Sequence, residues 1–443
     1  MPEAPATITG PAAALHFAVI TSPVRGHFNP LLALANALQE RGCRVTFVHI
    51  ADAEALTRGT SVDFRAVGAR RYPAGALRRY CERLAAASGI VGTVRMVVAT
   101  ARLCNMLCLE APAAIRALGA DVVIADVAEP AGALIARHLG LRFVGMITGL
   151  PLHADPIVPP PFLGWPVDLS PRGIRHIRRA YRVTAALMSP ITRVLRRHAR
   201  SWSLPGDPGQ VLSPILNVAQ CPPGLDFQRS LPGPRIAWCG PFRSNESEQL
   251  DLPPGDGRPL VFCSLGTLQG GRYKIFHMIA TVCAELGVRA VIAHCGLLTD
   301  AEVRALPGDP LVRAFWPQRA ILGHVQAAIV HGGFNTALDA LAAGVPMVVV
   351  PIAFEQPGTA ARLYAAGAAV VVPRRRLTRG KLRAALARVL GEPSFKTAVG
   401  RFAGQLSGMD GAKEAADQIL SACLPAHPAT RLGSDYSSCP ADF

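Results

Sequence analysis

The chain has few aromatic residues, few acidic residues and none of several common binding motifs. Only 6% of its 443 residues are aromatic, and 30 acidic residues oppose 46 lysines and arginines, giving a formal net charge of +16. Its 11 cysteines include no C-x-x-C pair, and no G-x-G-x-x-G run occurs. Low aromatic content without a recognition motif argues against nucleic acid as the partner of this charge. The missing glycine fingerprint argues against a dehydrogenase.

Long apolar runs are also missing. The longest, around Pro346–Phe354, is short and contains proline, so we expect no transmembrane helix. Residues Met1–Ala14 are rich in Pro and Ala without a basic segment, so we expect no secretory signal. Most cysteines lie in apolar contexts, as Cys263 and Cys295 do, which indicates reduced thiols in a cytoplasmic protein.

The positive charge is concentrated in one part of the chain. No acidic residue occurs between Arg172 and Arg200, and arginines there recur twice at i, i+3, i+4 and i+7. With apolar neighbours such as Ile174, Ile177 and Tyr181, this pattern is typical of basic amphipathic helices that attach to an anionic membrane surface, here the inner face of the cytoplasmic membrane. An ordinary solvated basic face is the alternative. The two quartets are Arg175, Arg178, Arg179 and Arg182, then Arg193, Arg196, Arg197 and Arg200.

Strands and helices alternate along the first half of the chain. His16–Ile20 reads as a short apolar strand, followed by a turn and by a helix expected to begin at Asn29-Pro30. Cys43–Ile50 reads as the next strand, and Asp121–Asp126 begins a further strand–helix unit. Repeated β-α-β units predict an α/β fold with a parallel, doubly wound sheet.

A second set of such units begins at Leu260–Leu265, after a stretch dense in Pro, Gly and Ser. We therefore expect two domains. The predicted division is a first domain at 1–228, a linker at 229–258, a second domain at 259–424 and a disordered polar tail at 425–443. The second domain is expected to finish with a helix at Ala412–Leu420.

Two polar residues are expected at the carboxyl edge of the first sheet, where doubly wound folds bind ligands. His27 lies in the turn after the first strand, and Asp126 ends the strand that starts at Asp121. A neutral imidazole at this edge can take a proton from a reacting hydroxyl. A structural role for the histidine and a capping role for the aspartate are the alternatives, and spacing alone does not select Asp126.

The second half contains the outline of a nucleotide-sugar site. A glycine turn after His331 leads into a helix that starts near Asn335 and Thr336, so its backbone N–H groups and positive dipole end suit a phosphate. Asp339 lies one turn past Asn335 on the same helix face. Its carboxylate can accept hydrogen bonds from sugar hydroxyls.

This segment resembles the donor-binding signature of family 1 UDP-glycosyltransferases, which runs W-x-P-Q, H-C-G-W-N-S, an acidic residue and D-Q. Two further segments, Ser264–Gly270 and Ala293–Gly296, resemble the bacterial zeaxanthin glucosyltransferase branch of that family. The family has an Asp where this chain has Glu355. The side chain of Glu355 is longer by one methylene, which affects the sugar that the site accepts. The counterparts here are Phe315-Trp316-Pro317-Gln318, His331-Gly332-Gly333-Phe334-Asn335-Thr336, Asp339 and Glu355-Gln356.

The resemblance implies a GT-B fold, with two Rossmann-like domains facing a cleft and a final helix that crosses back onto the first domain. It implies that His27 is the catalytic base and that Asp126 is bonded to it. It implies no metal and no cofactor beyond the UDP-sugar co-substrate. The implied donor contacts are Phe315 on uracil, Gln318 and Asp339 on ribose, Ser264, Thr267, His331, Gly333, Asn335 and Thr336 on the diphosphate, and Glu355 and Gln356 on the sugar.

The implied reaction is inverting transfer of a hexose, expected to be glucose, from a UDP-sugar to a hydroxyl of an apolar acceptor. The expected acceptor is a carotenoid such as zeaxanthin. Because the resemblance is strongest in the donor half, a macrolide, sterol or other polyketide-like acceptor is the alternative. A UDP-sugar epimerase is a further alternative, which His27 in its Gly-His turn disfavours. A non-catalytic membrane-surface protein is disfavoured by the presence of His27, Asp126 and His331.

Overall fold

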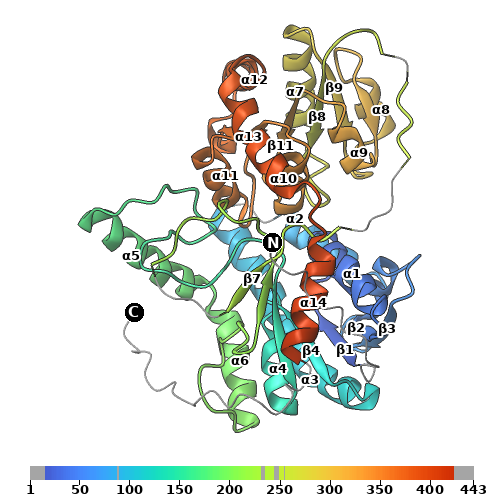
Figure 1. Ribbon diagram of the computed structural model, residues 1–443, viewed down its shortest axis with the longest axis vertical. Coiled ribbons are helices and arrows are strands. Elements are labelled where there is room, and N and C mark those ends of the chain that lie inside the picture. The colour runs from blue at the N-terminus through green and yellow to red at the C-terminus, as the bar shows by residue number, and fades with distance from the viewer. Residues whose placement is uncertain (1–14, 87–88, 231–234, 244–248, 254, 424–443) are drawn as a thin grey trace, which may run out of the picture.

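A computed structural model describes residues 15–86, 89–230, 235–243, 249–253 and 255–423, and the predicted tail at 425–443 lies outside them (Figure 1). Two parallel sheets form two domains, as the alternation of strands and helices predicted. The first sheet has the order β3-β2-β1-β4-β5-β6-β7 and the second β10-β9-β8-β11-β12-β13. Their strands are short, apolar and mostly buried, as expected where helices cover both faces.

The elements of the first domain, in chain order, are β1 (His16–Ile20), α1 (Arg25–Gln39), β2 (Arg44–Ile50), the 3-10 helix η1 (Ala51–Leu56), β3 (Asp63–Val67), α2 (Ala76–Ala85), α3 (Gly89–Leu118), β4 (Val122–Asp126), α4 (Ala131–Leu139), β5 (Arg142–Ile147), α5 (Pro171–Leu187), α6 (Ser189–Ser201), β6 (Asn217–Ala219) and β7 (Ile236–Trp238).

The remaining elements are β8 (Leu260–Ser264), α7 (Tyr273–Glu285), β9 (Arg289–Ala293), α8 (Asp300–Arg304), β10 (Leu311–Arg313), α9 (Gln318–Leu322), β11 (Ala327–Val330), α10 (Phe334–Ala342), β12 (Met347–Val349), α11 (Gln356–Ala365), β13 (Ala369–Val371), the 3-10 helix η2 (Arg374–Arg376), α12 (Arg379–Gly391), α13 (Pro393–Leu406) and α14 (Gly411–Cys423).

The strand order of each sheet reverses next to its first strand. In the first sheet β1 pairs with both β2 and β4, and in the second β8 pairs with both β9 and β11. Helices on the two sides of such a point leave in opposite directions, which opens a crevice at the carboxyl ends of the strands. The two crevices therefore lie where β1 meets β4 and where β8 meets β11.

Two predicted boundaries are wrong. Helix α1 begins at Arg25, so Pro30 lies inside it and His27 is in its first turn rather than in a loop. Proline removes only one helix hydrogen bond, and the helix continues past it. The predicted linker at 229–258 contains β7, which pairs with β6 as the last strand of the first sheet. Strands of three residues are too short to show a recognisable pattern in sequence.

The final helix returns to the first domain. Figure 1 shows α14 leaving the second domain and running beside α1. Arg41, two residues after the end of α1, donates to Asp417 of α14 at 2.7 Å, and Arg142 at the start of β5 donates to the carbonyl of Cys423. The chain therefore connects the two domains twice, once before β8 and once before α14.

One helix among the described residues, α3, is long and apolar enough to cross a membrane by length and composition, over 28 residues from Val91 to Leu118. In the sequence this segment is not one long apolar run, because Arg95 and Arg102 interrupt it. In the structure α3 packs against α4, α6 and the strands β2 and β3, and residues such as Leu103 and Leu107 are fully buried there. It is a core helix of the first domain.

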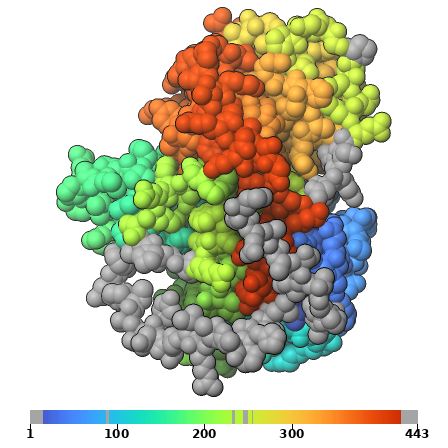
Figure 2. Space-filling view, in the orientation of Figure 1, coloured from blue at the N-terminus to red at the C-terminus, as the bar shows by residue number. Residues whose placement is uncertain are grey.

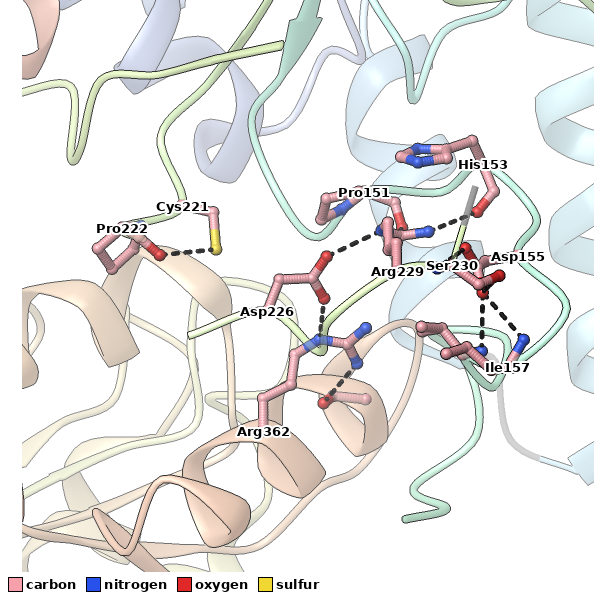
Figure 3. Close-up of polar contacts among 12 residues, drawn as sticks. Pro151, His153, Asp155, Ile157, Cys221, Pro222, Asp226, Arg229, Ser230 and Arg362 are labelled. Carbon is pink, nitrogen blue, oxygen red and sulfur yellow. Dashed lines mark hydrogen bonds and ion pairs between the residues drawn. The ribbon is translucent and has the colours of Figure 1, made fainter. Parts of the chain in front are cut away.

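A buried ion-pair cluster joins the two domains (Figure 3). Arg362 of α11 donates to Asp226, which follows β6, at 2.6 Å, and their side chains are only 2% and 8% exposed. Asp226 also accepts from Arg229 at 3.0 Å, and Arg229 donates to the carbonyls of Pro151 and His153. Two guanidinium groups from different domains thus share one carboxylate.

We expect Asp226→Asn to lower the free energy of unfolding by about 3 kcal/mol, because it leaves the buried Arg362 guanidinium without its counter-charge. Thermal and denaturant unfolding would measure the change. The matched control is Asp417→Asn, which breaks the Arg41 pair at a carboxylate that is 61% exposed. That change should cost less than about 1 kcal/mol. Equal losses in the two variants would show that the Asp226 cluster adds nothing beyond an exposed pair.

Candidate active site

A cleft of about 1770 Å³ separates the two domains, and both crevices open into it. Small-molecule sites usually enclose about 300–1,000 Å³, so the cleft has room for two ligands side by side. Its first-domain wall includes His27. On the second-domain side, the residues predicted to bind the donor line it together: Ser264, Thr267, Phe315, Gln318, His331, Gly333, Asn335, Thr336, Asp339, Glu355 and Gln356.

His27 and Asp126 meet where β1 adjoins β4. The Nδ1 atom of His27 lies 2.8 Å from the Asp126 carboxylate and 2.7 Å from the hydroxyl of Thr148. The carboxylate also accepts hydrogen bonds from the hydroxyl of Thr21 at 2.7 Å and from the backbone N–H of Ala128 at 3.0 Å. A carboxylate held in this way orients the imidazole and leaves Nε2 as its reactive nitrogen.

The charges of this pair stabilise each other. Burial alone would lower the pKa of His27, but the charge and hydrogen bond of Asp126, with smaller contributions from Glu355 and Glu129, raise that pKa above its ordinary value. Burial likewise opposes ionisation of Asp126, but the imidazolium, Thr21 and Ala128 outweigh it and lower the Asp126 pKa. Because His27 remains 25% exposed in the cleft, it can exchange a proton with a ligand.

The second-domain crevice has the features of an anion site. Helix α10 begins at Phe334, after Gly333, and no side chain caps it. Its first backbone N–H groups are therefore open to an anion, and the helix dipole favours negative charge there. Ser264 ends β8 beside Val330 of β11, which brings the Ser264 hydroxyl close to this helix end. The sequence predicted the glycine turn and the helix that follows it.

His331 is held between two glycines at this helix end. A Cβ atom on Gly266 would lie 2.5 Å from the His331 Nε2 atom, and one on Gly333 would lie 2.3 Å from it. Only residues without a side chain fit at these two positions. Burial lowers the pKa of His331 to about 4, so the imidazole is neutral at pH 7. A neutral ring can donate one hydrogen bond to a phosphate oxygen without binding a proton.

Asp339 already has two protein partners. Its carboxylate accepts from Arg243 Nε at 2.6 Å and from Gln318 Nε2 at 2.6 Å, and the Gln318 carbonyl accepts from the hydroxyl of Thr336 at 3.2 Å. A carboxylate offers about four lone-pair sites, so two remain for a diol. Arg243 follows β7, and no spacing or motif in the sequence singled it out.

Asn335 connects the two domains. Its Nδ2 donates to the carbonyl of Gly26 at 2.7 Å, and its Oδ1 accepts from Gln220 at 2.8 Å. Pro30 has no N–H to bond the Gly26 carbonyl, which is why that carbonyl is available inside α1. The side chain of Asn335, predicted to contact the diphosphate, is instead bonded to the domain that carries His27. Its backbone N–H still lies in the first turn of α10.

The neighbouring residues Phe315 and Trp316 differ in exposure. Trp316 is buried, and its indole N–H donates to the carbonyl of Ile292 at 3.1 Å. Phe315 is 59% exposed and lines the cleft, as the predicted stacking residue must.

The Gln356 side chain is partly used by the protein. Its carbonyl accepts from the backbone N–H groups of Ile352 and Ala353, both at 2.9 Å, so only its amide nitrogen remains for a ligand.

One part of the first-domain wall is mostly apolar, and we call it the apolar chamber. Its side chains come from α2, α3 and α6, from the end of α5 and from the loop before α5, whereas α1 contributes polar residues such as Asn36 and Gln39 to the cleft. Among the described residues no group of three or more His, Cys, Asp or Glu side chains could hold a metal ion. Representative wall residues are Tyr80, Leu84, Val97, Phe162, Met188 and Ile191.

Known proteins share both the fold and the sequence. A solved structure described as the glycotransferase of kitacinnamycin superimposes with a TM-score of 0.72 at 20% identity and covers 93% of this chain and 100% of its own. The zeaxanthin glucosyltransferase of Pseudescherichia vulneris is 34% identical over 92% of this chain and 98% of its own length. That of Pantoea ananas is 35% identical over 79% and 82%.

The two parallel-sheet domains have the GT-B fold, which the solved structures share. The sequence profile of the family described as "UDP-glucoronosyl and UDP-glucosyl transferase" matches residues 255–406. With relatives this similar over nearly its full length, the chain belongs to the UDP-glycosyltransferase family. It is a UDP-dependent glycosyltransferase, and the resemblance seen in the sequence is confirmed.

Proposed function

We propose that the enzyme transfers a hexose, glucose in the first instance, from its UDP-sugar to a hydroxyl of a carotenoid diol such as zeaxanthin, with inversion at the anomeric carbon. The observation that carries this proposal is the cleft itself. His27, bonded to Asp126, lines this cleft together with the residues predicted to bind the donor and with the apolar chamber, and this arrangement supports the proposal. The relatives named zeaxanthin glucosyltransferases supply the acceptor class.

His27 would act as the general base. Its Nε2 would take the proton of the acceptor hydroxyl as the oxygen attacks C1 of the sugar, and Asp126 would stabilise the imidazolium that forms. The donor would lie against the second domain, so attack would come from the face opposite the diphosphate. That geometry inverts the anomeric carbon. Holding the two reactants in line lowers the barrier further, by several kcal/mol in well-aligned systems.

The leaving diphosphate would be stabilised by the first turn of α10. Backbone N–H groups after Gly333, the neutral His331 ring and the hydroxyl of Ser264 would donate hydrogen bonds to its oxygens. Phe315 would stack on the uracil ring, and Asp339 would accept from the ribose hydroxyls. Glu355 precedes α11 in the cleft and is close enough to raise the pKa of His27, so it would contact the transferred sugar beside the base. In this arrangement no metal ion is required.

A product screen tests the proposal. Purified enzyme would be incubated with UDP-glucose and a panel of apolar alcohols that includes zeaxanthin, a sterol and a macrolide aglycone, and products would be identified by mass spectrometry. NMR of the product would report the configuration of the new bond. We expect a β-glucoside of the carotenoid diol. Glucosylation of the macrolide or sterol alone would reject the acceptor, and an α-glucoside would reject inversion.

Replacing Asp339 tests the donor site. We expect Asp339→Ala to raise the KM for UDP-glucose by about tenfold or more, because the ribose hydroxyls lose their charged acceptor. Binding of UDP and of its 2′,3′-dideoxy analogue would be compared by calorimetry. The wild type should prefer UDP, and the variant should bind both equally. If the variant keeps that preference, Asp339 serves only to hold Arg243 and Gln318, and another group binds the ribose.

A further inference from the structure

Helix α5 stands out from the body of the first domain, away from both sheets (Figures 1 and 2). Only a narrow stripe of it is buried, formed by Gly173, Ile177 and Ala180. Ile177 and the half-buried Tyr181, whose hydroxyl donates to the carbonyl of Val158, therefore pack inward. The sequence pattern suggested that these two side chains enter a membrane. Their packing against the domain rules this out.

The outward side of α5 is strongly basic. Arg175, Arg179 and Arg182 are spaced by four and three residues, which places them on the side opposite the buried stripe, and all three are exposed. None of the three forms an ion pair with a carboxylate among the described residues. Three uncompensated positive charges on one helix side favour an anionic surface.

Exposed apolar side chains accompany these arginines. Trp165 and Leu169, in the loop that leads into α5, are 42% and 62% exposed, and Val183 on α5 is 54% exposed. Large apolar residues next to arginines are the combination that inserts into the interfacial layer of a bilayer, where Trp is favoured. We define the α5 surface as Arg175, Arg179, Arg182, Trp165, Leu169 and Val183.

The helix that carries the α5 surface also contributes to the wall of the cleft. The last turns of α5 carry Thr184, and Met188 follows them; both line the cleft, as does Phe162 in the loop before the helix. The same helix thus presents arginines to solvent and forms part of the chamber wall. A bilayer on the α5 surface would therefore lie close to the part of the cleft that we propose for the apolar acceptor.

We propose that the α5 surface docks the enzyme on anionic lipid bilayers, so that the chamber takes its acceptor directly from the membrane. Arginines would contact the lipid phosphates while Trp165 and Leu169 enter the interfacial layer. Only the second part, that the acceptor comes from the membrane, rests on the proposed function. Lipid binding itself is measured without substrate.

The test is co-sedimentation with vesicles of phosphatidylcholine, with and without phosphatidylglycerol. We expect wild-type enzyme to sediment with the anionic vesicles only, and to be released at about 1 M salt, where the Debye length falls to ~3 Å. The triple variant R175E/R179E/R182E should bind the anionic vesicles about 100-fold more weakly. The matched control is R374E/R375E/R376E, which reverses three exposed arginines of η2 and changes the net charge equally. It should bind as the wild type does.

Two further measurements separate this surface from other basic faces. W165A/L169A leaves the charge unchanged and should weaken vesicle binding by about tenfold. Binding to heparin, a soluble polyanion, would be measured in parallel. The proposal is overturned if wild-type enzyme binds neutral and anionic vesicles equally, or if both triple variants lose the same affinity. It is also overturned if R175E/R179E/R182E loses heparin binding while keeping its affinity for vesicles.

Activity then links docking to acceptor delivery. R175E/R179E/R182E should transfer sugar normally to an acceptor dispersed in detergent and poorly to the same acceptor in anionic vesicles. Equal loss in both media would show a general defect and would reject delivery from the membrane. If wild-type enzyme modifies no carotenoid in detergent, the proposed acceptor is wrong, and the vesicle measurements still decide whether the α5 surface binds lipid.

Discussion

Replacing His27 with alanine is expected to lower kcat by about 10³-fold and to leave the affinity for UDP nearly unchanged. The reason is that the base and the donor site belong to different domains. His27 lies in the first turn of α1, whereas the anion site is built by β8, β11 and α10 of the second domain. Steady-state kinetics with a saturating acceptor, and calorimetry with UDP, would measure the two quantities separately.

The control is His277→Ala, which removes an exposed histidine of α7 that does not line the cleft. It should be as active as the wild type. Near-normal turnover of the His27 variant across pH 6 to 9 would exclude His27 as the base. A loss of UDP affinity in that variant would place His27 in the donor site instead.

The rate should also depend on pH in a defined direction. Only neutral imidazole can accept a proton, and the carboxylate of Asp126 raises the pKa of His27 above its usual 6.5. Activity should therefore rise with pH through an apparent pKa above 6.5 and fall as the imidazole becomes protonated below it. Because His27 and Asp126 are coupled, this apparent value belongs to the pair.

Asp126→Asn is expected to have an effect on kcat of similar size. The change removes the charge but keeps one side-chain oxygen, which can still accept from the backbone N–H of Ala128. By analogy with other His–Asp pairs we expect kcat to fall by about 10²–10⁴-fold, because the imidazolium loses its counter-charge and the ring its preferred tautomer. The pKa of His27 should fall as well, so the rising limb of the pH profile should move to lower pH.

Thr148→Val is the matched control for this variant. It removes the hydroxyl that lies 2.7 Å from His27 Nδ1 but leaves the carboxylate in place. We expect a loss of less than about tenfold and no shift of the pH profile. If Asp126→Asn kept near-normal kcat and left the profile in place, Asp126 would serve only as a backbone cap for Ala128, a bond that the amide oxygen retains.

Local sequence determined much of the fold and the elements that form the site. Apolar runs such as His16–Ile20 and Ala327–Val330, alternating with helical spacing, could be recognised because each lies within one short stretch of chain. Parallel pairing then brings their carboxyl ends together, which is why His27 and Asp126, 99 residues apart, were both expected at one sheet edge. The glycine turn before α10 likewise indicated an anion site by itself.

The partners of these residues were decided by tertiary structure alone. Arg243 reaches Asp339 across 96 residues, and Gln220 reaches Asn335 across 115, through contacts that no local pattern encodes. A contact from the other domain also completes the first turn of α1. Pro30 has no N–H to donate to the Gly26 carbonyl, and the Asn335 side chain donates to that carbonyl instead.

The same division holds for the basic surface. The spacing of the arginines predicted an amphipathic helix, because helical periodicity is a local property. Which apolar side chains face inward was settled by the fold. Ile177 and Tyr181 pack against the domain, and Trp165 and Leu169 remain exposed. Sequence thus fixes the chemistry that each short segment can offer, and the packing of distant segments decides which of those groups meet each other and which meet solvent.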